Sequence, residues 1–170
     1  MSMKFQPLRS AKYFFLRFTR LQGNPTVLAR GIAIGTFIGI TPTIPFHTIL
    51  ALFFAVSLRG SKIAALLATF LVSNPLTFFL QYYLSFRIGN LLLSRHISWE
   101  KMSELMAAIS NGGNFSESLT ALGHMGMTTI FVLLLGGFIL AIPFTVATYV
   151  LSFLFFRSLQ QKRRERHILK

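Results

Sequence analysis

Residues 31–58 read GIAIGTFIGITPTIPFHTILALFFAVSL, and no charged residue lies between Arg30 and Arg59. As a continuous helix at about 1.5 Å per residue, this segment would be about 42 Å long, enough to cross a hydrocarbon core of about 30 Å. Its middle contains Pro42 and Pro45, and prolines remove helix hydrogen bonds and clash with the preceding turn. The segment therefore predicts a membrane-embedded helix that is broken into two half-helices near its first proline.

Two further apolar segments also contain a proline. Residues 63–86 have Ser73-Asn74-Pro75 at their centre. Asparagine favours the N-cap of a helix and proline favours the first helical position, so we expect one half-helix to end near Ser73 and another to start at Pro75. Residues 125–156 contain Gly136-Gly137 and Pro143. The sequence thus predicts an all-α integral membrane protein, a single domain over residues 1–170 with three proline-broken apolar segments.

The composition supports this class. The chain is 53% hydrophobic and 12% charged, and a soluble domain usually has about twice that charged fraction. A net charge of +13 would also fit a nucleic-acid-binding protein. However, the basic residues lie before, between and after the apolar segments, where they attract anionic lipid headgroups. We therefore expect the lipid bilayer and its anionic lipids as partners, and no nucleic acid.

Three other stretches surround the apolar segments. In residues 8–22, apolar side chains fall on one helical face and basic ones on the other, which is typical of an N-terminal amphipathic helix in the membrane interface. The alternative is a surface helix packed on a core. Gly23-Asn24-Pro25 is expected to end this helix. Residues 96–124 form a polar connection, and residues 157–170 form a basic tail that we expect to fray into the cytoplasm.

Charge also predicts a topology. Both ends of the chain are basic, and the positive-inside rule puts both in the cytoplasm of a multi-pass protein of the bacterial inner membrane. Three simple crossings would separate the ends, so at least one segment should enter and return as a re-entrant hairpin. The basic turn at residues 59–62 favours the first segment, although the sequence does not decide which segments return. Irregular backbone at membrane depth needs burial, which a chain of this size supplies more easily as a homo-oligomer.

A family resemblance lies within residues 29–93. The run ARGIAIGTFIG at 29–39 is followed by Thr41-Pro42 and His47, then by Ala64, SNPLT at 73–77 and Gly89. These motifs resemble the bacterial membrane family catalogued as domain of unknown function 2062. The resemblance implies a small inner-membrane protein. Since some members are joined to glycosyltransferase domains, it also suggests a glycosyltransferase as a partner.

The constellations of an enzyme are missing from the sequence. Its four Glu residues lie outside the apolar segments, and its four His residues lack metal-ligand spacing. Gly-rich loops that match a phosphate-binding fingerprint are missing as well. We therefore expect no catalytic activity, no metal and no cofactor.

Polar residues inside the apolar segments are better candidates, because polar groups at membrane depth are costly. The predicted substrate-binding residues lie at the first two breaks: Thr41, Pro42, His47, Asn74, Pro75 and Thr77. Half-helices that start near Thr41-Pro42 and Asn74-Pro75 would direct positive dipole ends, which bind anions, to the middle of the protein. Two structural alternatives stay open, since Asn74 could serve only as a cap and His47 only as a packed side chain.

Two more groups have predicted roles. Glycines recur every four residues at Gly31, Gly35 and Gly39, a spacing that indicates close helix packing. Basic residues border the apolar segments, where they should contact headgroups or the interface: Arg30, Arg59, Lys62 and Arg87.

Two functions follow from these features. The first is a protein that transports or handles an anionic or lipid-linked phosphate substrate at the N-termini of its broken helices. The second is a non-transporting scaffold or assembly factor for an envelope glycosylation or lipid pathway. In the second case the prolines and glycines serve packing, and the basic arms recruit anionic lipids or a partner.

Overall fold

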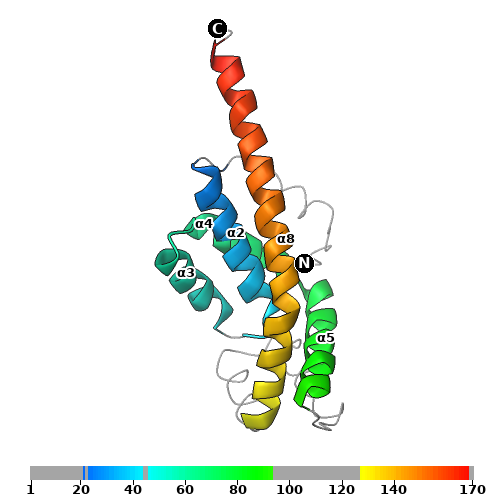
Figure 1. Ribbon diagram of the computed structural model, residues 1–170. Coiled ribbons are helices and arrows are strands. Elements are labelled where there is room, and N and C mark those ends of the chain that lie inside the picture. The colour runs from blue at the N-terminus through cyan, green and yellow to red at the C-terminus, as the bar shows by residue number, and fades with distance from the viewer. Residues whose placement is uncertain (1–20, 22, 44–45, 94–126, 169–170) are drawn as a thin grey trace, which may run out of the picture.

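The computed structural model describes residues 21, 23–43, 46–93 and 127–168. Within these residues all regular structure is helical, as the sequence predicted. The helices are α2 (Pro25–Ile40), α3 (His47–Ser57), α4 (Lys62–Val72), α5 (Pro75–Leu93) and α8 (Met127–Ile168). α2 and α5 lie beside the long α8, while α3 and α4 pack against α2 (Figure 1). The predicted interfacial helix at 8–22, apart from Leu21, and the polar connection at 96–124 lie outside the described residues.

Two helices start at the same signal, an asparagine followed by a proline. Asn74-Pro75 opens α5 where the sequence predicted a helix start. Asn24-Pro25 opens α2 in the same way, because the Asn24 side chain accepts a hydrogen bond from the Thr26 N–H at 2.9 Å. Asn24-Pro25 was predicted only to end the preceding helix, and the apolar segment was counted from Gly31. Helix α2 starts six residues before Gly31, because Asn24 is its N-cap.

The first apolar segment forms a hairpin of two helices. α2 ends at Ile40, and α3 starts at His47 and leads back toward the start of α2. There the Ser61 N–H, just beyond α3, donates to the Val27 carbonyl oxygen at 2.9 Å. Both ends of the segment therefore lie at the same end of the molecule. With 16 residues, α2 is about 24 Å long, which is shorter than a hydrocarbon core of about 30 Å.

The helix α4 runs in the same direction as α2 and contacts it through glycines. Hydrogen bonds join the two at a constant separation of 34 residues: Ser61 to Val27, Thr69 to Gly35 and Ser73 to Gly39. A Cβ atom on Gly31 or Gly35 would collide with a backbone carbonyl oxygen, that of Ser61 or Ala65. Glycine at these positions lets the two backbones approach closely, as small residues do between membrane helices.

The third apolar segment belongs to one continuous helix. α8 has 42 residues and runs through Pro143 without ending, so the prediction of a break here is wrong. Pro143 removes one helix hydrogen bond, but no capping residue precedes it and no second proline follows, so the turns on either side keep the helix intact. The basic tail was expected to fray, yet residues 157–168 continue α8, which corrects that prediction as well.

Contacts with α2 and α5 fix α8 in the bundle. α8 runs opposite to α2, since Phe156 packs on Leu28 while the Phe138 ring meets the Phe37 ring edge-on at 5.2 Å. On α5, a Cβ atom added to Gly136 of α8 would collide with the Ser85 carbonyl oxygen. The α5–α8 crossing is therefore as close as the α2–α4 contact. The axes of α4 and α5 differ by 85°, so the second apolar segment is sharply bent at its centre.

Candidate functional site

The two helix breaks lie together in the structure. The Ser73 hydroxyl, at the end of α4, donates to the Gly39 carbonyl oxygen near the end of α2 at 3.0 Å. The His47 ring at the start of α3 faces Phe70 of α4 edge-on, with 6.5 Å between ring centroids. We call this region the break junction and define it by its polar and proline residues: Thr41, Pro42, Thr43, His47, Ser73, Asn74 and Thr77. Most of the predicted substrate-binding residues thus meet in one place.

The hydroxyl groups on the α2 side of the junction satisfy backbone carbonyls. The Thr41 hydroxyl donates to the Phe37 carbonyl oxygen at 2.8 Å. The Thr43 hydroxyl lies 3.4 Å from the Ile38 carbonyl oxygen and 3.3 Å from that of Thr41. The last carbonyls of a helix have no partner within it, so these side chains supply donors where α2 ends. This use of the threonines is a structural role.

The α4 side of the junction is built in the same way. The Thr77 hydroxyl accepts the Asn74 N–H at 3.2 Å, which is one half of a capping box, and donates to the Val72 carbonyl oxygen. The Gln81 side-chain amide also donates to the Val72 carbonyl oxygen, at 3.0 Å. Ser73 and Gln81 were absent from the predicted site. A serine at a helix end and a glutamine one turn after Thr77 are the sequence signals for these roles.

The helix starts at the junction differ from the predicted pair. α5 starts at Pro75 as expected, but α3 starts at His47 and not at Thr41-Pro42. The reason is a turn after the first proline, in which the Phe46 N–H donates to the Thr43 carbonyl oxygen at 2.7 Å. Phe46 then precedes α3 without a side-chain cap. His47 Nδ1 is buried and has no hydrogen-bond partner in the described part of the chain. The first of the two helix starts at the junction is therefore the uncapped start of α3.

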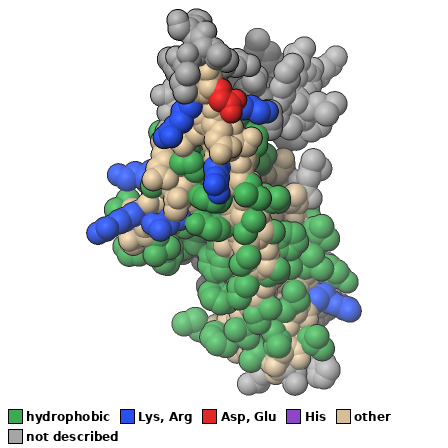
Figure 2. All heavy atoms as spheres, turned by 45° about the horizontal axis from the view of Figure 1, so that its top comes forward, with side chains coloured by type: hydrophobic (Ala, Val, Ile, Leu, Met, Phe, Trp, Pro, Cys, Tyr) green, Lys and Arg blue, Asp and Glu red, His purple; other side chains and the backbone are tan. Residues whose placement is uncertain are grey.

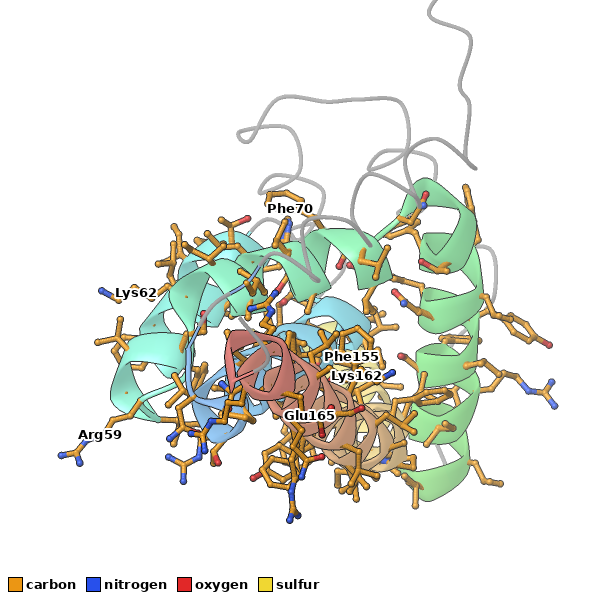
Figure 3. All side chains as sticks on the ribbon, turned by 90° about the horizontal axis from the view of Figure 1, so that it is seen from above. Arg59, Lys62, Phe70, Phe155, Lys162 and Glu165 are labelled. Atoms are coloured by element: carbon orange, nitrogen blue, oxygen red, sulfur yellow. The ribbon has the colours of Figure 1, made fainter. Side chains whose placement is uncertain are left out.

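The helix directions bring basic side chains to one end of the molecule. The start of α2, the turn between α3 and α4, and the last turns of α8 meet there, since the Gln160 side chain donates to the Gly23 carbonyl oxygen. We call this region the basic end; its lysines and arginines are all exposed: Arg30, Arg59, Lys62, Arg157, Lys162, Arg163 and Arg164. Arg59 and Lys62 point outward from the bundle (Figure 3). Three of the four predicted headgroup residues thus share one end.

The fourth predicted headgroup residue, Arg87, lies elsewhere. It is exposed on α5 between Ser85 and Gly89, which contact α8 at residues 132–136. These α8 residues precede Phe156 by 20 to 24 positions, or about 30–36 Å along the helix. Arg87 therefore lies about one hydrocarbon thickness away from the basic end.

On the face shown in Figure 2, the surface away from the basic end is largely apolar. Only 28% of the most apolar stretch of α8 is buried, and large side chains such as Phe131, Val146 and Leu151 are more than half exposed. In the described part of the chain, α8 is long and apolar enough to cross a membrane by itself, and α4 with α5 forms a bent apolar pair that is compatible with either a broken span or a re-entrant loop. Within the same residues, no three histidine, aspartate or glutamate side chains gather where they could share a metal ion.

These features define an all-helical protein with at least one helix that is able to span a membrane. More particularly, the chain belongs to the family described as uncharacterized protein conserved in bacteria, domain of unknown function 2062, whose model matches residues 8–165. This confirms the resemblance seen in residues 29–93 and extends it over nearly the whole chain. No curated protein and no solved structure matches the chain.

Proposed function

We propose that this chain is a multi-pass protein of the bacterial inner membrane that handles a lipid carrying an anionic phosphate. The observation that carries the proposal is the separation of charge from apolar surface. Of the eight described lysine and arginine side chains, seven lie at the basic end, next to a long and mostly exposed apolar helix. Positive charge at the cytoplasmic boundary and apolar surface within the bilayer are the pattern of an inner-membrane protein.

The arrangement of the helices supports a topology with both ends in the cytoplasm. The α2–α3 hairpin starts and finishes at the basic end, so it would dip into the bilayer and return. α4 and α5 would then cross as one bent span, and α8 would cross back. The start of the described chain supports this order, because Gly23 is hydrogen-bonded to Gln160 in the last turns of α8.

The break junction supports a binding role on the side of the apolar region away from the basic end. Two breaks in apolar segments meet there, next to Gly137 of α8, against which Pro42 packs. Gly137 lies 19 residues before Phe156, about 28 Å along α8, so the junction lies toward the end of the apolar region that is remote from the basic end. The uncapped N–H groups at the start of α3 would attract an anionic group there.

A scaffold without transport is the second candidate function. It is favoured by one specific observation, namely that the hydroxyls of Thr41, Ser73 and Thr77 donate to backbone carbonyls. Polar side chains used in this way hold the fold and leave fewer groups for a substrate. In this function the basic end would recruit anionic lipids or a partner such as a glycosyltransferase.

Lipid retention after purification tests the proposal. The full chain, extracted in a mild non-ionic detergent, is examined by native mass spectrometry for co-purifying lipids and for subunit number. We expect retained phosphate-bearing lipids of net negative charge, and a rise in thermal stability when such a lipid is added back, because a ligand that binds only the folded state stabilises it by mass action. Equal retention and equal stabilisation with zwitterionic lipid would contradict the proposal.

A further inference from the structure

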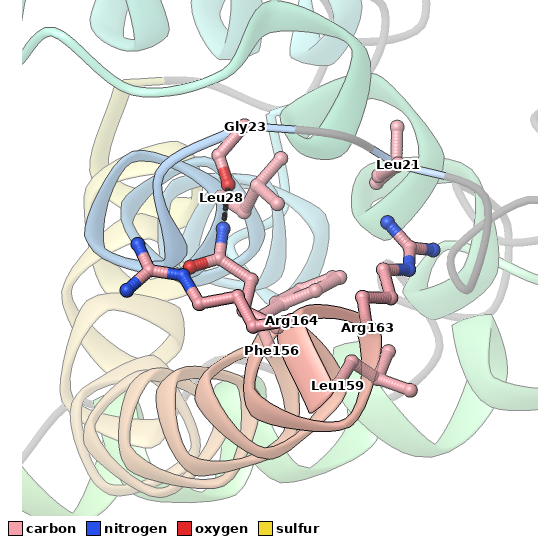
Figure 4. A pocket seen from close by; sticks show the side chains of 8 residues that line it. Leu21, Gly23, Leu28, Phe156, Leu159, Arg163 and Arg164 are labelled. Atoms are coloured by element: carbon pink, nitrogen blue, oxygen red, sulfur yellow. Dashed lines mark hydrogen bonds between the residues drawn. The ribbon is translucent and has the colours of Figure 1, made fainter. Parts of the chain in front are cut away.

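A hollow of about 370 Å³ lies at the basic end, between the start of α2 and the last turns of α8 (Figure 4). Its floor is apolar and consists of Leu28 from α2 with Phe156 and Leu159 from α8. Arg163 and Arg164 line its rim and extend toward opposite sides of it. The hollow therefore combines an apolar base with two cationic groups.

The sequence of α8 explains this combination. The α8 residues that line the hollow are 156, 159, 160, 163 and 164, which recur every three or four positions and so share one helical face. Along that face, the aromatic Phe156 is followed by the aliphatic Leu159 and then by two arginines, all within a little over two turns. The Gln160 side chain fixes it against α2, because its amide donates to the Gly23 carbonyl oxygen.

The depth of the hollow fits a lipid headgroup. Phe156 is the last apolar residue before Arg157, so the edge of the hydrocarbon core would lie near it in the proposed topology. Arg163 follows Phe156 by seven residues, which corresponds to about 10 Å along the helix. The headgroup region beyond the hydrocarbon edge is about 5–8 Å thick on each side. The guanidinium groups, on flexible side chains, would thus lie at about the height of phosphates.

We propose that this hollow binds one phospholipid of net negative charge. Its phosphate would lie between Arg163 and Arg164, and the first part of its acyl chains would pass over Leu159. Guanidinium groups recognise phosphate oxygens through paired, charge-assisted hydrogen bonds. Lipids whose headgroup has no net charge would bind to the two arginines less strongly. The volume suits a phosphate headgroup and its glycerol, while the acyl chains remain in the bilayer. This inference rests on the membrane placement proposed above and assigns a binding site to it.

Two double variants of the full chain separate the hollow from the basic end as a whole. R163Q/R164Q removes two charges at the rim, and R59Q/K62Q removes two charges at the same end from side chains that do not line the hollow. The apparent affinity of each for phosphatidylglycerol is measured by native mass spectrometry in detergent. Phosphatidylcholine and inorganic phosphate are the comparison ligands, and size-exclusion chromatography verifies folding.

We expect the native chain to bind one phosphatidylglycerol more tightly than phosphatidylcholine, with no competition from inorganic phosphate at the same concentration. R163Q/R164Q should lose at least about tenfold in affinity, while R59Q/K62Q loses less than about threefold. Equal losses in both variants, or none in either, would overturn the site but leave the proposed function intact. A native chain that shows no preference for phosphatidylglycerol would overturn both.

A third variant tests the apolar floor. Leu159→Trp adds bulk inside the hollow without changing the charge at its rim. We expect it to lower phosphatidylglycerol binding by at least about fivefold, because the space for the glycerol and the first methylenes is filled. Unchanged binding by a folded Leu159→Trp protein would show that the arginines act from the surface alone, and would overturn the hollow as the site.

Discussion

The hydroxyl of Thr69 on α4 lies 3.2 Å from the carbonyl oxygen of Gly35 on α2 and 2.9 Å from that of Ala65 in its own helix. Thr69 is 1% exposed, so this shared hydrogen bond is shielded from solvent and lipid. It is possible only because Gly35 has no side chain and lets α4 approach. The bond and the glycine together fix the register of the two helices that carry the breaks.

Replacing Thr69 tests the bond between the helices. Thr69→Val keeps the shape of the side chain but removes the donor, and we expect a loss of about 1 kcal/mol in stability. Thr69→Ser is the control, since it keeps the hydroxyl and loses only a methyl group. Thermal unfolding in detergent measures both. A Thr69→Val protein as stable as the native chain would show that the bond contributes nothing.

The glycines of α2 give a second, graded prediction. A Cβ atom on Gly35 would meet the backbone of Ala65, whereas one on Gly39 would meet the Val72 side chain at 3.1 Å. Side chains can shift and backbone at a helix contact cannot, so Gly35→Ala should destabilise the protein by about 1–3 kcal/mol. Gly39→Ala should be near neutral, because alanine gains helix propensity of about 1 kcal/mol that offsets the crowding. The reverse order of melting temperatures would contradict the packing of α2 on α4.

Local signals in the sequence predicted local structure well. Asn74-Pro75 located the start of α5, because capping and proline geometry depend on neighbouring residues alone. The same signal at Asn24-Pro25 was interpreted only as the end of the preceding stretch. The start of α2 was missed because polar residues flank it. The effect of Pro143 on the helix was overestimated. A proline without a capping residue beside it bends or weakens a helix and need not end it.

Long-range geometry could not be predicted in this way. The constant separation of 34 residues between α2 and α4 depends on how a turn folds back, which no local pattern encodes. The contact between Gln160 and Gly23 spans 137 residues, so the hollow at the basic end is invisible in the sequence. The predicted residues at the breaks lie near one another, but the partners of Ser73 and Gln81, the carbonyl oxygens of Gly39 and Val72, could not be predicted from the sequence.

The anion site at the break junction has its own test at Asn74. Asn74→Asp keeps a capping acceptor but adds a negative charge, and Asn74→Ser caps without charge. If the junction binds an anion, the Asp variant should fold and lose its lipid or its function, because like charges repel strongly where the dielectric is low. The Ser variant should behave as the native chain does. A folded Asp variant with normal lipid retention and full growth complementation would end the anion-site hypothesis.

Residues 8–22, nearly all of which lie outside the described residues, carry a separate prediction. A synthetic peptide of this sequence should become helical on anionic vesicles at low salt, since its basic face meets a negative surface potential. Binding should weaken as salt rises, because the charges are screened. Circular dichroism measures both effects, with zwitterionic vesicles as the control. A peptide that stays unstructured on anionic vesicles would contradict an interfacial helix.

The central claim, that the basic end faces the cytoplasm and the start of α8 faces the opposite side, is tested most directly by cysteine accessibility. The native chain has no cysteine, so single substitutions label without background. Arg59→Cys reports on the basic end. Met127→Cys reports on the start of α8, where the native Met127 side chain is 85% exposed. These variants are treated with a membrane-impermeant maleimide in intact and in permeabilised spheroplasts. We expect Met127→Cys to be labelled in intact spheroplasts and Arg59→Cys only after permeabilisation. Labelling of Arg59→Cys in intact spheroplasts would contradict the central claim.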